Sequence, residues 1–505
     1  MDRVYRFFRS RIFLYTLIFL FCLALSCMCK SYDNDLYARL IVGENFIEKG
    51  VFNYNDFLSY TPTHPWYDHE WGSGVVFYFF LKYLGNVGLI LLQAITTFFT
   101  VFFITKIQSL QKHAFPIMLL PIVGFLFLFF HQNPNIVRCH MFSFMFFSMF
   151  LYFLEKVRKS DSNLIWFVLP IVVIWNNLHG GVVSGIGIIA IYMVCAMFSS
   201  KPWVKYLYVL LGALPLLLIN PYGYEYLKFL ISANTMARTF IEEWQNVCMP
   251  IHIMYYAGIV IFVLFVLFLA TSFFKKKSFN ITKLALLVVT TYLGIIHIKL
   301  LSLTLIVAYA YYYNELMFLF RPKLLKILNK LAYVLVVLFI AYIPFTNPVE
   351  ARTSITKFPV KEVEFLRINN IKGNLLSLFG YGSYITYKLY PNNLIYMDGR
   401  YEEVYNDEEF DNLLKFEQVE ENWKSVLEKY PTEILMPDKK LPVYEQLLKS
   451  NAWVNIYEGP VCGVFVKKDM VKENYILPSE DIRYYKKHEF DTLGAFGRYS
   501  KGNKD

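Results

Sequence analysis

The sequence predicts a mainly α-helical, polytopic membrane protein of about eleven transmembrane helices, followed by an extracytoplasmic α/β domain. Composition is the first observation behind this fold class. The chain of 505 residues is 56% hydrophobic and only 17% charged, whereas soluble domains are about 45–50% apolar and about 25% charged. A soluble core does not need so many apolar side chains, so most of the chain is predicted to lie in a membrane.

The distribution of charge is the second observation. Residues 1–349 hold 27 basic and 14 acidic side chains, whereas residues 350–505 hold 22 basic and 25 acidic side chains in less than half that length. The change predicts a transmembrane domain over 1–349, a boundary near Glu350 and a soluble domain over 350–505. The net charge of +10 then reflects membrane topology, and we expect no nucleic-acid partner.

Cysteine usage excludes two kinds of structural site. Seven cysteines are scattered along the chain, and Cys462 is the only one after residue 350. The C-terminal domain is therefore predicted to have no internal disulfide. No CxxC pair is flanked by histidines, which argues against a structural zinc site.

Apolar runs predict the transmembrane helices. They lie near residues 11–29, 86–105, 114–131, 141–154, 163–178, 181–198, 206–219, 252–273, 281–297, 300–319 and 331–346. Several are shorter than the roughly 20 residues that cross a bilayer. The first run is long for a signal peptide and no A-x-A cleavage motif follows it, so we interpret it as an uncleaved anchor.

Basic residues test this arrangement, because cytoplasmic loops are rich in Lys and Arg. Of the 27 basic residues before residue 350, 19 lie in alternate loops. These loops are residues 3–11, 106–112, 156–159, 201–205, 275–283 and 321–330. The N-terminus is then cytoplasmic and the 350–505 domain lies outside. The alternation holds only if residues 72–84 do not cross, so we predict that they form an interfacial helix on the outer surface.

The first outer loop, residues 30–71, contains two carboxylates directly after the first helix. Asp33 and Asp35 could serve as a general base and as ligands of a divalent metal, Mg²⁺ or Mn²⁺. They could equally form a solvated turn after the helix, which the spacing alone favours. Carboxylates at a membrane interface are costly unless they are used or paired, so both interpretations stay open.

The same loop continues with a helical pattern and a polar cluster. The apolar periodicity over 35–49 predicts an amphipathic interfacial helix. His64, Asp68, His69 and Glu70 then follow among prolines and aromatic residues. Two histidines with two carboxylates can bind a metal or move protons. Beside two tryptophans and a tyrosine they can also anchor the chain in the aromatic belt of the interface, which the spacing favours.

Short loops on the predicted outer side carry a further set of polar residues. They are Arg138, His140, Asn177, His179, Glu243, His297 and Lys299. A single histidine in such a loop is usually an interfacial side chain, but the whole set lies on one side of the predicted topology. We expect these residues to converge, with Asp33 and Asp35, on one outward-facing cavity in which Arg and Lys bind a lipid phosphate or pyrophosphate.

The 350–505 region has the pattern of an α/β domain. Helices are predicted over 360–369, 408–418 and 421–430, and strands over 381–390, 432–437 and 462–468. Asp398 and Arg400 follow a buried apolar run, and we interpret them as structural residues. The chain has no Walker loop, GxGxxG or GxSxG motif, so nucleotide hydrolysis and serine-hydrolase chemistry have no support.

Several stretches together resemble a family of bacterial polytopic membrane proteins that is grouped with the GT-C glycosyltransferases. The matching segments are residues 33–73, NIVRCH (135–140), WNNLHGG (175–181), NPYGYEY (220–226), IEEW (241–244) and residues 380–405. The first and last are the most specific. The family pattern has Arg-Pro-His where this chain has Arg138, Cys139 and His140. The missing proline affects the local bend of the backbone more than the role of the arginine.

The resemblance implies a fold, a donor and a location. GT-C enzymes take a sugar from a polyprenyl-phosphate or polyprenyl-diphosphate donor. They carry a catalytic acidic residue just after the first helix, at the place of Asp33 or Asp35. The HPW segment at 64–66 resembles the stretch that precedes an interfacial helix in the family. Eleven spans with a cytoplasmic N-terminus and an outer soluble domain also occur there, and the bacterial inner (cytoplasmic) membrane is the implied location.

We therefore expect a membrane glycosyltransferase that moves a sugar from a polyprenyl-phosphate-linked donor to a lipid, glycan or protein acceptor. Asp33 or Asp35 is the expected general base, and Arg138, His140 and Lys299 are expected to bind the donor phosphate. The expected substrate pocket comprises His64, His69, Glu70, Asn177, His179, Glu243 and His297. A transporter or flippase of lipid-linked glycans and a non-catalytic scaffold in envelope assembly are the alternatives. Transporters tend to place charge at mid-membrane within internal repeats, a pattern not seen here.

Overall fold

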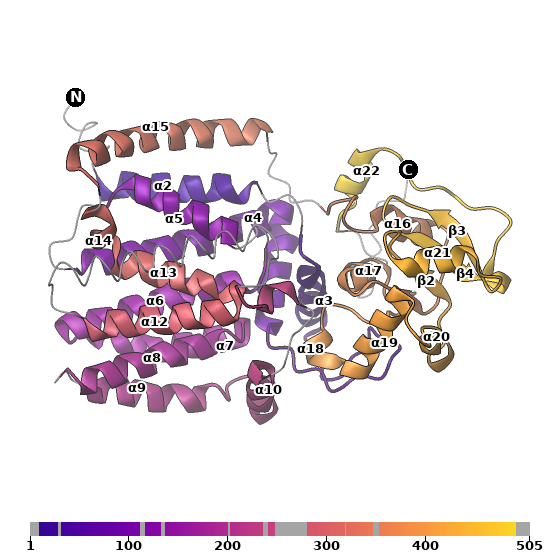
Figure 1. The fold of residues 1–505 in the computed structure, drawn as a ribbon, viewed down its shortest axis with the longest axis horizontal. Coiled ribbons are helices and arrows are strands. Elements are labelled where there is room, and N and C mark those ends of the chain that lie inside the picture. The colour runs from indigo at the N-terminus through magenta and orange to yellow at the C-terminus, as the bar shows by residue number, and fades with distance from the viewer. Residues whose placement is uncertain are drawn as a thin grey trace. The chain divides into compact units, whose positions relative to one another are not determined.

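The protein is mainly helical and contains one small four-stranded sheet in the computed structural model (Figure 1). The structure describes residues 10–28, 32–111, 117–132, 137–199, 203–235, 241–247, 280–318, 320–346 and 353–490. The chain forms two compact units. Unit 1 comprises Met1–Cys29 with Asn86–Glu350, and unit 2 comprises Lys30–Gly85 with Ala351–Asp505.

Unit 1 is a helical bundle. Its helices are α2 (Arg11–Ser26), the second part of α4 (Trp71–Ser109), α5 (Leu119–Gln132), α6 (His140–Ser160), α7 (Val168–Leu178), α8 (Val182–Met197), α9 (Trp203–Leu216), α10 (Gly223–Thr235), α12 (Ile281–Ile296), α13 (Leu301–Tyr311), α14 (Tyr313–Phe318) and α15 (Pro322–Thr346), with 3₁₀ turns η1 (Asn163–Phe167), η2 (Glu242–Trp244) and η3 (Ile298–Leu300). Helix α12 packs against α8 and α13, α6 packs against α7 and α8, and α15 packs against α2 and α5 (Figure 1).

The helices of unit 1 follow the predicted apolar runs. Each predicted span overlaps a helix, except 252–273, which lies outside the described residues. Among the described helices, Trp71–Ser109 and Pro322–Ile343 are long and apolar enough to cross a membrane by length and composition. Seven other apolar helices have 10–17 residues. The helical class is therefore confirmed, whereas the number of membrane crossings stays a prediction.

Helix α4 consists of two helices joined at Gly85. This residue has a φ of 61° and a ψ of −155°, which interrupts the helix. A positive φ favours glycine, because glycine has no Cβ to clash with the backbone. The part before Gly85 belongs to unit 2 and the part after it to unit 1. This break agrees with the separate 72–84 helix predicted from the sequence; its place at a membrane interface stays a prediction.

Unit 2 combines helices with a sheet. Its helices are α3 (Asn34–Lys49), the first part of α4, α16 (Val360–Ile368), α17 (Gly382–Leu389), α18 (Tyr401–Val404), α19 (Asp407–Gln418), α20 (Ser425–Lys429), α21 (Pro442–Leu448) and α22 (Ile482–Lys487). The strands are β1 (Leu375–Ser377), β2 (Ile434–Met436), β3 (Trp453–Glu458) and β4 (Gly463–Lys467). They follow the order β1-β2-β4-β3, with β1 parallel to β2 and the other pairs antiparallel.

The segment expected as the first outer loop is part of this sheet-containing unit. Ile395 forms parallel bridges to Leu375 of β1 and to Ser59. The Ile395 N–H donates to the Leu58 carbonyl at 3.0 Å, and the Tyr60 N–H donates to the Ile395 carbonyl at 3.2 Å. Residues near 59 and 395 therefore extend the sheet beyond β1. The boundary predicted near Glu350 agrees with the division into units, but residues 30–85 belong with the C-terminal domain rather than with 1–349.

Three local predictions in this unit need correction. Residues 381–390 were expected as a strand because aromatic and β-branched residues favour strands, but α17 covers this segment and is buried on most of its surface. The tyrosines recur every three residues, which suits a helix packed on several sides.

The amphipathic helix expected over 35–49 is present as α3, yet it is buried continuously from Leu36 to Asn45. Of the helix expected over 421–430, only α20 is helical.

A close approach of two backbones fixes α3 against the first part of α4. A Cβ on Gly43 would overlap the carbonyl oxygen of Gly74, and a Cβ on Gly74 would overlap the carbonyl oxygen of Arg39. Only glycine at both positions allows this spacing. The contact holds Arg39 close to the residues that precede α4.

Gly43→Ala is expected to lower the free energy of unfolding by about 1–3 kcal/mol, because the added methyl group must push two backbones apart. The measurement is thermal and denaturant unfolding of the full chain in detergent. Gly380→Ala is the matched control, because a Cβ there meets nothing within 4 Å. Equal stability of the two variants would contradict the close approach.

Candidate functional site

Arg138 and Lys299 share one carboxylate in unit 1. Arg138 Nη1 donates to Glu243 Oε2 at 2.7 Å, and Lys299 Nζ lies 3.7 Å from Glu243 Oε1. Two permanent cations thus face one anion. We call Arg138, His140, His179, Glu243, His297 and Lys299 the helix-end cluster, because each lies where a helix of unit 1 begins or ends or in a 3₁₀ turn.

Contacts around η2 and η3 hold Glu243 and Lys299 in place. The Val247 N–H donates to the Ile295 carbonyl at 3.0 Å, and the Ile298 N–H donates to the Gln245 carbonyl at 3.0 Å. These bonds tie the segment after Glu243 to the end of α12. Lys299 Nζ also lies 3.4 Å from the centre of the Trp244 ring, a cation–π contact.

His297 and His179 are positioned by backbone groups. His297 Nδ1 lies 2.8 Å from the Trp244 carbonyl oxygen. The Gly181 N–H donates to His179 Nδ1 at 2.9 Å, and Ser143 Oγ lies 2.7 Å from the same nitrogen. Because a backbone N–H can only donate, Nδ1 of His179 is an acceptor and the ring carries its proton on Nε2.

Contacts with Ser143 explain the tryptophan and the second glycine of the segment WNNLHGG (175–181). Trp175 Nε1 donates to Ser143 Oγ at 2.7 Å, which leaves the Ser143 hydroxyl free to donate to His179. A Cβ on Gly181 would overlap Ser143 Oγ. Glycine at 181 is therefore required for the close packing of the His179 ring against α6.

The two cations of the helix-end cluster control the ionisation of Glu243. Burial raises the pKa of Glu243, but Arg138 and Lys299 outweigh burial and lower the pKa to about 2. Glu243 is therefore ionised at neutral pH and neutralises one of its two cation partners. His140 lies within electrostatic range of Arg138, His179, Glu243 and Lys299. Among the six residues of the cluster, two permanent cations therefore face one carboxylate, with imidazole groups beside them.

The structure thus brings together six of the residues that sequence analysis expected to converge. Asn177 has a different role, because its Nδ2 donates to the carbonyls of Val173 and Ile219 at 2.8 Å each and so fixes the end of α7. Asp33 and Asp35 belong to unit 2. Asp33 is the N-cap of α3, and its Oδ1 accepts a hydrogen bond from the Asn34 N–H at 2.8 Å.

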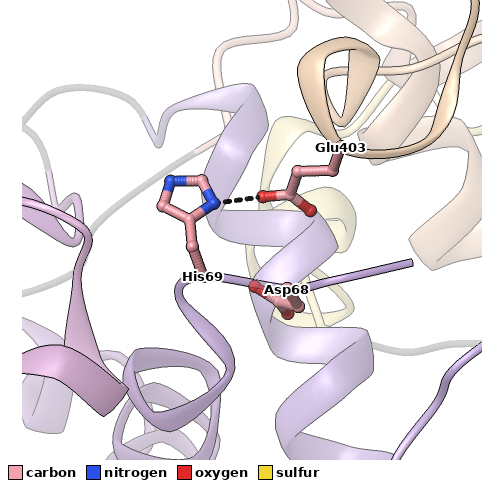
Figure 2. Close-up of side chains that lie close together, drawn as sticks. All are labelled: Asp68, His69 and Glu403. Carbon is pink, nitrogen blue, oxygen red and sulfur yellow. Dashed lines mark ion pairs between the residues drawn. The ribbon is translucent and has the colours of Figure 1, made fainter. Parts of the chain in front are cut away.

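A second polar cluster lies inside unit 2 around the buried guanidinium of Arg39. Arg39 donates to Asp68 Oδ1, donates to Glu403 Oε1 at 2.7 Å and lies 3.1 Å from Glu70 Oε2. His69 Nδ1 lies 2.9 Å from Glu403 Oε1 (Figure 2). We call these five residues the acidic cluster. His64 is exposed outside it, and its backbone N–H donates to the Val404 carbonyl at 2.7 Å.

The acidic cluster continues into a second buried arginine site. Trp66 Nε1 donates to Glu403 Oε2 at 2.7 Å, and the Arg400 guanidinium lies 4.4 Å from the Trp66 ring. Arg400 pairs with Asp398 at 2.9 Å and with Asp56 at 2.7 Å, and all three side chains are buried. This arrangement agrees with the interpretation of Asp398 and Arg400 as structural residues.

Burial and charge act differently on the members of the acidic cluster. Burial raises the pKa of Asp68 to about 7, opposed by Arg39 and reinforced by Glu403. Burial also acts against ionisation of Glu403, but Arg39 and His69 outweigh it and lower the Glu403 pKa to about 2. For His69 burial lowers the pKa, but Glu70 and Glu403 outweigh burial and raise it to about 9.

Sequence reasoning found Asp68, His69 and Glu70 but missed Arg39 and Glu403. The signal for Arg39 was a permanent charge within the apolar periodicity of residues 35–49, where a buried arginine must find carboxylate partners. Glu403 is separated from Arg39 by 364 positions. No local spacing connects them, so only the three-dimensional structure identifies the pair.

Arg39→Met is expected to lower the free energy of unfolding by about 3–5 kcal/mol, because it leaves buried carboxylates without their cation. Lys82→Met is the matched control, since Lys82 forms a more exposed ion pair with Glu48 whose loss costs at most about 1 kcal/mol. Both values come from unfolding of the full chain in detergent. A loss below 1 kcal/mol for Arg39→Met would contradict the central role of this side chain.

The Arg138–Glu243 pair predicts a pH dependence of stability. Because the folded-state pKa of Glu243 is lowered to about 2 from 4.5, the pair stabilises the fold above pH 4.5 and this contribution disappears as the pH falls towards 2. Glu243→Gln is expected to unfold at a lower temperature than wild type at pH 6, with a difference that shrinks between pH 4.5 and 2.5. Glu225→Gln, at an exposed pair with Lys228, should show no such trend. A difference that stays constant down to pH 2.5 would refute the assignment.

Comparison with models of known protein families finds no match for this chain, and comparison with curated proteins also finds none. The structural features that bear on function are the two polar clusters and the exposed apolar side chains of the helices.

Proposed function

We propose that this protein is a membrane glycosyltransferase that binds the phosphate of a polyprenyl-linked sugar donor at the helix-end cluster. The observation that carries the proposal is the sharing of Glu243 by Arg138 and Lys299. A guanidinium and an ammonium group therefore converge on one carboxylate at the helix ends. A phosphate group can be bound there through charge-assisted hydrogen bonds from a guanidinium and an ammonium group.

Exposed apolar side chains support the membrane part of the proposal. Helix α15 has a largely exposed apolar surface that includes Ile327, Val334, Leu338 and Phe345. Contiguous exposed apolar surface of this kind marks contact with lipid or with another protein. The first part of α4 likewise exposes Phe79, Tyr83 and Leu84, as an interfacial helix requires. These surfaces support a membrane location, whereas the GT-C-like fold of unit 1 and the bacterial inner membrane follow from the resemblance alone.

The proposed reaction is substitution at the anomeric carbon of the donor sugar. The acceptor hydroxyl oxygen forms a bond to that carbon, and the bond between the carbon and the phosphate oxygen breaks. The phosphate leaves with the electron pair, and Arg138 and Lys299 stabilise its charge. The hydroxyl proton goes to a carboxylate acting as general base.

Asp35 is the general base that the family resemblance implies, and Asp33 serves as the N-cap of α3. The family resemblance implies an acidic residue at this place in the chain. Asp35 is half-buried in the first turn of α3. Asp33 is expected to orient α3 and to take no proton.

A transporter or flippase of lipid-linked glycans is the second candidate function. A phosphate site at helix ends would also serve such a protein. The cluster lies at helix ends, whereas transporters tend to place their binding site near the bilayer midplane within broken helices. The helix-end position therefore favours transfer.

Arg138→Met and Lys299→Met are each expected to weaken binding of a short-chain polyprenyl phosphate at least tenfold, about 1.4 kcal/mol, because each removes one cation from the site. Glu243→Gln is expected to strengthen binding, because it removes the competing anion. Binding is measured by calorimetry with the full chain in detergent.

Lys205→Met is the matched control, because Lys205 pairs with Asp161 outside the cluster. The phosphate-site assignment is abandoned if Arg138→Met and Lys299→Met both bind the lipid as wild type does. It is also abandoned if Lys205→Met weakens binding equally.

A further inference from the structure

The acidic cluster of unit 2 carries more negative than positive charge. Asp68, Glu70 and Glu403 surround Arg39, which is the one permanent cation among the five residues. The three carboxylates of the cluster thus outnumber its one arginine. Buried carboxylates are costly unless a cation compensates them, so the composition of the cluster favours an additional cation.

The neighbouring arginine does not supply this charge. Arg400 is held by Asp56 and Asp398 at 2.7 and 2.9 Å. That site therefore contains two carboxylates for one guanidinium. The two connected sites together have five carboxylates and two arginines, so the deficit grows when both are considered.

Three side chains of the acidic cluster have the spacing of metal ligands. One ligand atom each of Asp68, His69 and Glu403 lies within 4.8 Å of the others, and Figure 2 shows the His69 ring facing the Glu403 carboxylate. Ligand atoms bound at about 2.0–2.2 Å to one ion are about 3 Å apart or more, so little movement is needed. Imidazole together with carboxylates suits Zn²⁺ or Mn²⁺ better than Mg²⁺.

Asp68 provides an independent indication of a missing partner. Its Oδ1 accepts hydrogen bonds from Arg39 and from the Glu70 N–H at 2.8 Å. No group among the described residues donates a hydrogen bond to its Oδ2. The side chain is only 1% exposed, so bulk water does not solvate this oxygen. A buried carboxylate oxygen without a donor is costly, and a bound cation would satisfy it.

We propose that Asp68, His69 and Glu403 bind one divalent cation, Zn²⁺ or Mn²⁺. Arg39 then acts outside the ligand set, because its hydrogen bonds to Asp68 and Glu403 orient both carboxylates. His69 and Glu70 keep 20% and 13% of their side chains exposed, which gives the ion a route from solvent. The inference is independent of the proposed transferase activity, and it places the metal in this cluster rather than at Asp33 and Asp35.

The test measures bound metal directly. The full chain is purified in detergent, stripped with EDTA and titrated with Zn²⁺, Mn²⁺ and Mg²⁺ against a chromophoric chelator, and metal content is checked by mass spectrometry. Wild type is expected to bind one Zn²⁺ per chain, more tightly than Mn²⁺ and far more tightly than Mg²⁺. Bound Zn²⁺ should also raise its unfolding temperature.

The variants decide whether this site holds the ion. His69→Gln and Glu403→Gln should each weaken Zn²⁺ binding at least tenfold, whereas His69→Asp, which keeps a ligand, should retain binding with a preference shifted towards Mn²⁺. His64→Gln, in the same loop but outside the cluster, should bind as wild type does. The proposal is overturned if wild type binds less than half an equivalent of Zn²⁺, or if His69→Gln binds as tightly as wild type. Should Glu403→Gln fail to fold, the His69 variants still decide the question.

Discussion

The buried guanidinium of Arg39 is the interaction on which unit 2 depends. It lies on α3 and holds Asp68 and Glu70 from the segment before α4, and it also holds Glu403 from α18. One side chain therefore connects residues near position 40, residues near 70 and the C-terminal part of the chain. The close approach of Gly43 to Gly74 brings α3 near enough for these bonds.

The Trp66 ring connects this interaction to a second one of the same kind. Its N–H donates to Glu403, and the Arg400 guanidinium lies against its face. Together with the sheet extension near Ser59 and Ile395, these contacts explain why residues 30–85 form one compact unit with a domain that begins some 270 residues later. A segment that resembles a simple extracytoplasmic loop in sequence is thus part of a folded domain.

Unit 1 uses its charges differently. In unit 2 carboxylates outnumber arginines, whereas in the helix-end cluster two cations share Glu243. The first arrangement favours a cation and the second favours an anion.

The sequence predicted some of these features and could not predict others. Apolar runs located the helices of unit 1, because each needs a continuous apolar stretch. The approach of Arg138, Lys299 and Glu243 to one another was expected from the predicted topology, which placed their loops on the same side. The partnership of Arg39 with Glu403 has no local pattern. The tyrosine-rich segment of α17 was misread as a strand, because tertiary burial on several sides overrode residue preference.

Local sequence patterns also could not predict that residues 30–85 belong to unit 2. Their composition suits a loop at an interface, and the short pairing of Ser59 with Ile395 involves single residues rather than a recognisable strand. The roles of Asn177 and Asp33 are likewise set by backbone groups of their surroundings. Polar residues of these types serve structure or chemistry equally well, and only their hydrogen-bond partners distinguish the two.

The proposed transferase is tested most directly by mass spectrometry of surface glycans and glycolipids from cells that lack this protein. The deletion is complemented with wild type, Asp33→Asn, Asp35→Asn or Arg138→Met. We predict that a sugar is missing in the deletion and is restored by wild type and by Asp33→Asn, which keeps a capping residue, but not by Asp35→Asn or Arg138→Met. Restoration by all four forms would contradict transfer at these residues, and an unchanged glycan profile in the deletion would contradict the transferase itself.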